Sequence, residues 1–154
     1  MFQYGSGEVC HNNYQRLLSA KSQRAQAELV VGHGFLIYPA WNRIFLLDNL
    51  YIELNTSAAP SNRYLTLQVL DKQGMIVWAA GPTFVQAAGK IVGYSFCRSV
   101  SSSTVLSPLS FIELPTMPIF EDNVVEIFVD GIVLGDVISG GQYSFRDLIV
   151  NENT

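Results

Sequence analysis

Residues 63–79, with the sequence RYLTLQVLDKQGMIVWA, decide the fold class of this chain. Aliphatic residues recur at every second position in the first half of this stretch, at Leu65, Leu67 and Val69. This is the period of a strand with one buried face. The turn formers at residues 71–74 predict a hairpin, because Gly74 supplies the positive φ that such a connection needs. The stretch therefore predicts two antiparallel strands.

Further strands are predicted on both sides of this hairpin. Runs rich in aliphatic and aromatic residues stand at Leu29–Val31, Phe35–Tyr38, Ile44–Leu47, Leu50–Leu54, Thr83–Ala87, Lys90–Cys97, Leu109–Leu114, Val124–Val129, Ile132–Ile138 and Tyr143–Val150. Asp130-Gly131 is a strong signal for a two-residue hairpin, and Gly140-Gly141 predicts a break. Strands at intervals of roughly 8–12 residues are typical of an all-β sandwich or barrel. We expect an antiparallel, jelly-roll-like β-sandwich in residues 29–154.

Residues 1–28 differ from the rest of the chain. Gln, Ala and Arg are frequent there, and the apolar stripe that Tyr14, Leu17 and Leu18 would form on a helix is narrow. A short helix without a wide apolar face has little to stabilise it. The segment is therefore either a short helix or, as we prefer, an extended N-terminal arm.

The composition limits the partners that this protein can have. Only 14% of the 154 residues are charged and 49% are hydrophobic, whereas soluble domains carry about 25% charged residues. The net charge of −4 and the scattered nine Lys and Arg residues argue against nucleic acid. No apolar run reaches the roughly 20 residues of a membrane-spanning helix, and the N-terminus does not resemble a secretory signal. We expect neither nucleic-acid nor membrane partners, synthesis in a cytoplasm, and free thiols at Cys10 and Cys97.

No catalytic, metal or cofactor site is predicted. Zinc sites need three or four ligands at defined spacing, and the histidines His11 and His33 stand far apart, with only Cys10 beside the first. Glu53, Glu113 and Glu126 lie in predicted strands, where an outward, solvated carboxylate is normal. We therefore expect a protein that is not an enzyme.

The two tryptophans have different expected environments. Trp78 lies in a hairpin strand, where burial in the core is the usual outcome. Trp41 lies in a turn before the first strong strand, so we expect it to be more exposed. An exposed aromatic ring can stack on a sugar, which keeps a carbohydrate- or receptor-binding module open as an alternative function.

The order of short motifs resembles that of small jelly-roll virion proteins of tailed bacteriophages. Asn62-Arg63 precedes the aliphatic strand and its hairpin, Leu114-Pro115 precedes a later strand, and Gly135-Asp136-Val137 precedes the last strand through Tyr143–Val150. This resemblance covers about residues 30 to 150. It implies a capsid decoration or cement protein, a homotrimer that binds the major capsid protein on the exterior of the virion.

Under this resemblance, aromatic and aliphatic residues of the arm are candidates for contact with a neighbouring subunit. Such side chains are the usual anchors of protein interfaces. The candidate interface residues are Phe2, Tyr4, Tyr14, Leu17, Leu18 and Trp41. The alternative function is a carbohydrate- or receptor-binding module of a phage tail fibre or baseplate, because a jelly roll does not decide function.

Overall fold

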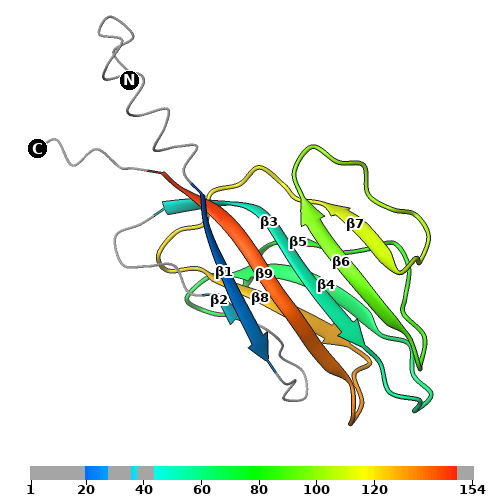
Figure 1. Cartoon of the computed structure of the whole chain (residues 1–154). Helices are drawn as coiled ribbons and strands as arrows, with labels where there is room; N and C mark the ends of the chain where they lie inside the picture. The colour runs from blue at the N-terminus through cyan, green and yellow to red at the C-terminus, as the bar shows by residue number, and fades with distance from the viewer. Residues whose placement is uncertain (1–19, 28–35, 38–43, 149–154) are drawn as a thin grey trace, which may run out of the picture.

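The computed structural model describes residues 20–27, 36–37 and 44–148, which form two β-sheets packed face to face (Figure 1). The strands of this part are β1 (Ala20–Ala27), β2 (Leu36–Ile37), β3 (Ile44–Asn55), β4 (Tyr64–Leu70), β5 (Ile76–Ala80), β6 (Ile91–Cys97), β7 (Leu109–Glu113), β8 (Val124–Asp130) and β9 (Val137–Leu148). The five-stranded sheet has the order β1-β9-β3-β6-β7, and the four-stranded sheet has the order β2-β8-β4-β5. The protein is an all-β sandwich, as the sequence predicts.

The hairpin that decides the fold class is confirmed. β4 and β5 pair antiparallel, and Gly74 adopts a φ of 79° in their turn. The inward residues of β4 are Leu65, Leu67 and Val69, which are all 0% exposed. Trp78 is 9% exposed and belongs to the core, as expected. The alternation of one strand therefore identified its buried face correctly.

The predicted hairpin at Asp130-Gly131 is wrong. β8 lies in the four-stranded sheet and β9 lies in the five-stranded sheet, so residues 131–136 cross between the sheets instead of turning within one. Gly131 does have a positive φ of 74°. A Cβ atom there would lie 2.1 Å from the carbonyl oxygen of Asn62. The glycine therefore allows two connections to approach each other closely. The Asp-Gly dipeptide alone does not show whether the chain turns back in a hairpin or crosses to the other sheet.

Two other strand boundaries differ from the prediction. Gly140-Gly141 does not break the chain, because β9 continues through it with both glycines opposite Ile52 of β3 as a β-bulge. A bulge inserts an unpaired residue and bends the strand without ending it. Thr83–Ala87 is not a strand, and only Gln86 forms an isolated bridge, with Arg63. The backbone N–H and carbonyl of Gln86 both bond to Arg63, and Pro82 has no N–H with which to extend a ladder.

The expectation that residues 1–28 lie outside the sandwich is wrong for Ala20–Ala27. This segment is extended, but it is strand β1 and pairs antiparallel with β9 at the edge of the five-stranded sheet. Of the early strands predicted between residues 29 and 38, the structure describes only β2, which pairs with β8. The rest of the predicted arm, residues 1–19, lies outside the described residues.

The sandwich is not wholly antiparallel, because β6 and β7 are parallel neighbours. Residues 98–108 carry the chain back to start β7, and their serines cover the outer edge of that strand. The backbone N–H of Phe111 donates to Ser103 Oγ at 2.9 Å, and that of Glu113 donates to Ser102 Oγ at 2.9 Å. Ser103 N–H also donates to the carbonyl of Phe111 at 2.8 Å. Serine side chains thus satisfy polar groups that an open sheet edge would expose.

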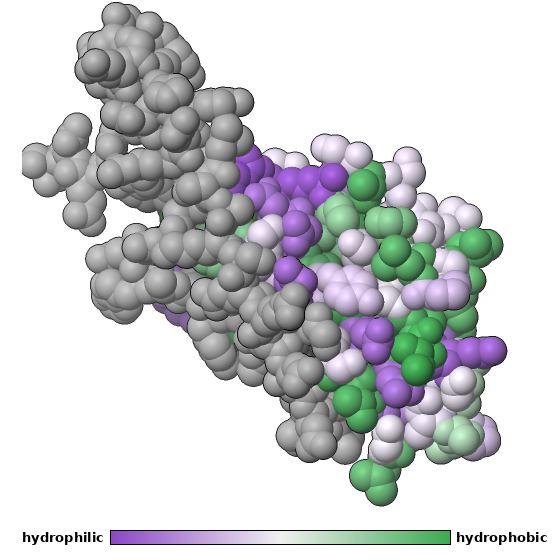
Figure 2. Space-filling view, in the orientation of Figure 1, coloured by the Kyte–Doolittle hydropathy of each residue, from purple (hydrophilic) through white to green (hydrophobic). Residues whose placement is uncertain are grey.

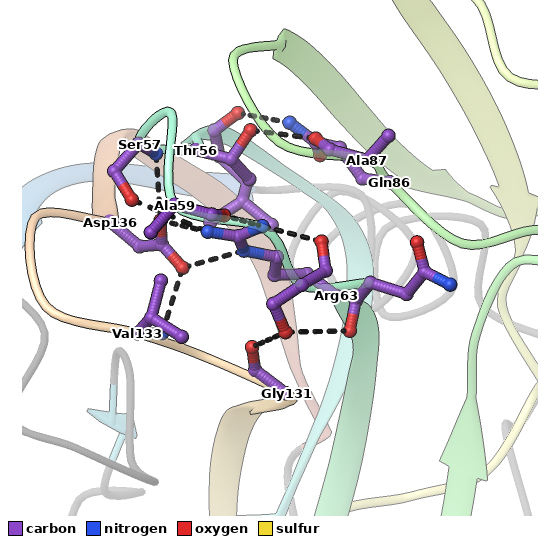
Figure 3. Close-up of polar contacts among 12 residues, drawn as sticks. Thr56, Ser57, Ala59, Arg63, Gln86, Ala87, Gly131, Val133 and Asp136 are labelled. Atoms are coloured by element: carbon purple, nitrogen blue, oxygen red, sulfur yellow. Dashed lines mark hydrogen bonds and ion pairs between the residues drawn. The ribbon is translucent and has the colours of Figure 1, made fainter.

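A buried ion pair joins the two sheets at one end of the sandwich (Figure 3). Arg63, directly before β4, donates from Nε to Asp136 Oδ2 and from Nη2 to Asp136 Oδ1, each at 2.8 Å. Asp136, directly before β9, also accepts the backbone N–H groups of Ser57 at 2.7 Å and Val133 at 3.0 Å. Burial acts to raise the pKa of Asp136, but the bonds from Arg63, Val133 and Ser57 outweigh it and lower this pKa to about 2.

Gln86 extends this polar network into the core. Its side-chain nitrogen donates to the carbonyl of Leu54 at 2.8 Å, and its Oε1 accepts the hydroxyl of Tyr94 at 2.8 Å. Burial raises the pKa of Tyr94, which therefore remains a hydrogen-bond donor. Because buried polar groups are costly unless they are bonded, these contacts fix the loops at this end of both sheets.

Candidate interface on the five-stranded sheet

The outer face of the five-stranded sheet carries exposed hydrophobic side chains over β6 and β7. Ile91 is 57% exposed, Leu109 46% and Phe111 40%. The two strands place them together, because Gly93 pairs with Leu109 and Ser95 pairs with Phe111. Figure 2 shows several hydrophobic groups on the half of this face where β6 and β7 lie. We call Tyr51, Ile91, Leu109 and Phe111 the β6–β7 patch.

Tyr51 joins the patch from β3 by lying across β6. A Cβ atom on Gly93 would meet the Tyr51 hydroxyl at 2.7 Å and Cε2 at 2.9 Å. Only a residue without a side chain leaves room for the ring in this position. Gly93 therefore permits an aromatic side chain to lie flat on the sheet next to Leu109. A flat aromatic and aliphatic surface of this kind is suited to contact with another protein.

A charged cluster stands at the end of the same sheet. β3 has one extra residue, Asp48, between the pairs that Leu47 and Asn49 make with β9. Arg146 of β9 binds the Asp48 carboxylate through Nε at 2.9 Å and Nη2 at 2.7 Å. Arg98, directly after β6, lies 3.9 Å from the same carboxylate. The bulge therefore brings two arginines to one aspartate.

The predicted site residues cannot be placed. Phe2, Tyr4, Tyr14, Leu17, Leu18 and Trp41 all lie outside the described residues. The β6–β7 patch was not among the sequence-based candidates, although Leu109–Glu113 contains the signal for it. Ile112 is buried, and its neighbours Leu109 and Phe111 are exposed. Large apolar side chains on both faces of one strand are the pattern that could have identified this surface.

The carboxylates considered for chemistry do not converge. Glu53 lies on the outer face of the five-stranded sheet, where its Oε1 accepts the hydroxyl of Ser139 at 3.4 Å. Glu113 is exposed on β7. Glu126 belongs to the four-stranded sheet and is only 3% exposed, so the expectation that it is solvated is wrong. Glu53 and Glu126 are therefore on opposite sides of the core.

The other sequence candidates for chemistry are partly outside the described region. Cys10, His11 and His33 are not described, and Cys97 has a free thiol, with Sγ 3.1 Å from Ser95 Oγ. Within residues 20–27, 36–37 and 44–148, no three His, Cys, Asp or Glu side chains come together as a metal site would need. The same residues contain no helix that is long and apolar enough to cross a membrane.

Comparisons with known proteins identify no family. No family model matches the chain, and no curated protein matches it. A chain in the structure of infectious bursal disease virus, Gx strain, is similar in structure, with a TM-score of 0.41 and 13% sequence identity. The match covers 88% of this chain and 34% of the viral chain, so this chain spans about a third of the length of that protein. At this TM-score the likeness is weak.

Proposed function

We propose that this protein is a structural virion protein that binds the exterior of a phage capsid and stabilises it, as a decoration or cement protein does. The observation that carries the proposal is the β6–β7 patch, in which Leu109 and Phe111 are 46% and 40% exposed on the face of a sheet. Large exposed apolar side chains that gather on one face are typical of interaction sites. The partner that we propose is the major capsid protein.

The physics of the patch favours burial against a protein surface. Phe111 and Tyr51 offer large, rigid side chains of the type that dominates interface energies. Removing water from a charged group costs free energy, whereas removing it from an apolar group is favourable. A chain with only 14% charged residues therefore loses less on docking than a typical soluble domain.

The proposed role includes no chemical reaction. This part of the proposal is supported by the separation of Glu53 and Glu126, which lie in different sheets. In glycoside hydrolysis the two catalytic carboxyl groups stand about 5 to 9.5 Å apart. The protein would act by occupying the surface of several neighbouring subunits, where modest contacts multiply through avidity.

The N-terminal residues remain part of the proposal as a second contact. Phe2, Tyr4, Tyr14, Leu17 and Leu18 would bind a neighbouring subunit. Because β1 begins at Ala20, a truncation that tests this contact should remove residues 1–19 and leave the sheet intact. We expect such a truncation to fold as the full chain does and to bind capsids more weakly.

The glycan-binding alternative has less support than capsid binding. Trp78, one of the two tryptophans, is 9% exposed and belongs to the core, so it cannot offer a stacking surface. The other, Trp41, lies outside the described residues. Binding of the protein to a glycan array at the same patch, without binding to capsids, would favour this alternative.

The test compares two exposed apolar positions on different sheets. Phe111→Ser removes the aromatic centre of the β6–β7 patch, and Val77→Ser removes an apolar side chain from β5, where Val77 is 49% exposed. Binding to virus capsids stripped of this protein is measured by co-sedimentation. We expect F111S to weaken binding about tenfold or more, which corresponds to about 1.4 kcal/mol, and V77S to leave it unchanged. Equal binding by F111S and the wild type would refute the proposed surface.

A further inference from the structure

We propose that Arg98 and Arg146 form a binding site for an oxyanion, either a carboxylate or a phosphate group. The site lies at the end of the five-stranded sheet, where the two arginines share Asp48. It shares no residue with the β6–β7 patch. Only the identity of its natural ligand, an acidic side chain of the capsid partner, rests on the proposed function.

The charges at this site do not balance. Arg146 binds both carboxylate oxygens of Asp48, and Arg98 is 3.9 Å from the same carboxylate. Among the side chains that the structure describes, Asp48 is the only carboxylate that pairs with either guanidinium group, so two positive charges share one negative charge. The side chains are 14% exposed at Arg98, 28% at Arg146 and 23% at Asp48. Water therefore screens the excess charge less than it would on an open surface.

Arg98 is held in place by hydrogen bonds to a neutral backbone carbonyl. Its Nε and Nη2 donate to the backbone carbonyl of Leu47 at 2.9 and 2.8 Å. Burial lowers the pKa of Arg98, Asp48 raises it and Arg146 lowers it. The fold thus keeps a second guanidinium close to the first, although their like charges repel.

Both guanidinium groups retain donors for a ligand. Neither Arg98 Nη1 nor Arg146 Nη1 makes a hydrogen bond in the part of the chain that the structure describes. Each of these nitrogens carries two N–H groups. Planar guanidinium donors match the geometry of carboxylate and phosphate oxygens. An oxyanion at this position would balance the excess charge and accept hydrogen bonds from both arginines.

The test uses the isolated full-length protein labelled with ¹⁵N. Sodium phosphate and sodium acetate are titrated separately, each against sodium chloride at equal ionic strength, and the arginine Nε–H resonances are followed by NMR. We expect a saturable shift of the Arg98 and Arg146 signals that chloride does not produce. A response to acetate indicates a protein carboxylate as the natural ligand, whereas a response to phosphate alone indicates free phosphate.

Two variants give the control. Arg146→Gln should weaken oxyanion binding about tenfold or more. Lys72→Gln removes the same charge from the exposed β4–β5 hairpin and should bind as the wild type does. If R146Q does not fold, Arg146→Lys keeps the charge without the planar fork and should also bind more weakly.

Shifts no larger than those in chloride, or equal losses in R146Q and K72Q, would overturn the proposal. No capsid is present, so this result is independent of the proposed function.

Discussion

Arg63 and Asp136 form a two-bond ion pair that connects the starts of β4 and β9, which belong to different sheets. Both side chains are 0% exposed. The same aspartate binds the backbone of Ser57 and Val133. One carboxylate therefore binds the β3–β4 connection, the β8–β9 connection and the arginine that precedes β4. The sandwich is therefore closed at this end by a polar contact and not by hydrophobic packing alone.

Removing either partner of this pair should strongly destabilise the fold. Arg63→Ala and Asp136→Ala each leave a buried charge without its partner, which costs about 3–5 kcal/mol. Because the second substitution removes the orphaned charge, the double variant should lose less than the sum of the two single variants. Urea denaturation of the four proteins measures this coupling. Additive losses would show that the two residues act independently.

The stability of the protein should depend on pH through Asp136. Its pKa is about 2 in the folded protein, below the ordinary 3.8, so the folded state binds the proton less tightly than the unfolded state. The stabilisation is complete above the ordinary pKa and is lost as the pH falls through the folded value. As the pH falls from about 5 to about 2, protonation of Asp136 should lower the unfolding free energy by about 2 kcal/mol.

The variant Asp136→Asn provides the control for this pH dependence. It lacks the titrating group, so its unfolding free energy should fall about 2 kcal/mol less than that of the wild type over the same range. Urea midpoints at several pH values give both curves. Parallel curves would show that other carboxylates cause the acid sensitivity.

Gly93→Ala should disturb the position of Tyr51. The new Cβ would lie 2.7 Å from the Tyr51 hydroxyl, so the ring must move off β6. Because Tyr51 is only half-buried on the outer face and its ring can turn away, the cost should lie near or below the low end of the roughly 1–3 kcal/mol that overpacking costs in a core. In a Tyr51→Ser background the obstruction is gone, and the same glycine substitution should cost much less. An equal cost in both backgrounds, measured by thermal unfolding, would place the strain elsewhere.

The serines beside β7 should protect its edge from pairing with other molecules. Ser102→Ala and Ser103→Ala each remove the acceptor of one backbone N–H of β7, a bond worth about 0.5–1.5 kcal/mol. We expect the double variant to aggregate faster than the wild type in light scattering. Ser101→Ala, at an exposed neighbouring position, is the matched control and should aggregate at the wild-type rate.

The sequence predicted those parts of the fold that depend on local alternation. The inward face of β4 and the burial of Trp78 followed from a two-residue period next to a turn with Gly74. The crossing at residues 131–136 could not be predicted, because it depends on the contact of Asp136 with Arg63, which is 73 residues away. β1 was missed because an edge strand with a polar sequence shows no hydrophobic period.

The candidate site was less predictable than the fold. The β6–β7 patch depends on the parallel pairing of Ser95 with Phe111, and a parallel neighbour joined by an irregular loop has no sequence signal. The arginine cluster depends on a bulge at Asp48, where the aspartate binds Arg146 of β9 and lies near Arg98, which follows β6. Both features arise from strand register, which is set by the whole sheet and not by any one segment.

The most direct test of the central claim is a cryo-EM reconstruction of the capsid with this protein bound. We predict that the outer face of the five-stranded sheet lies against the shell, with Leu109 and Phe111 buried on a capsid subunit. A reconstruction in which this face points to solvent and another surface contacts the shell would contradict the account.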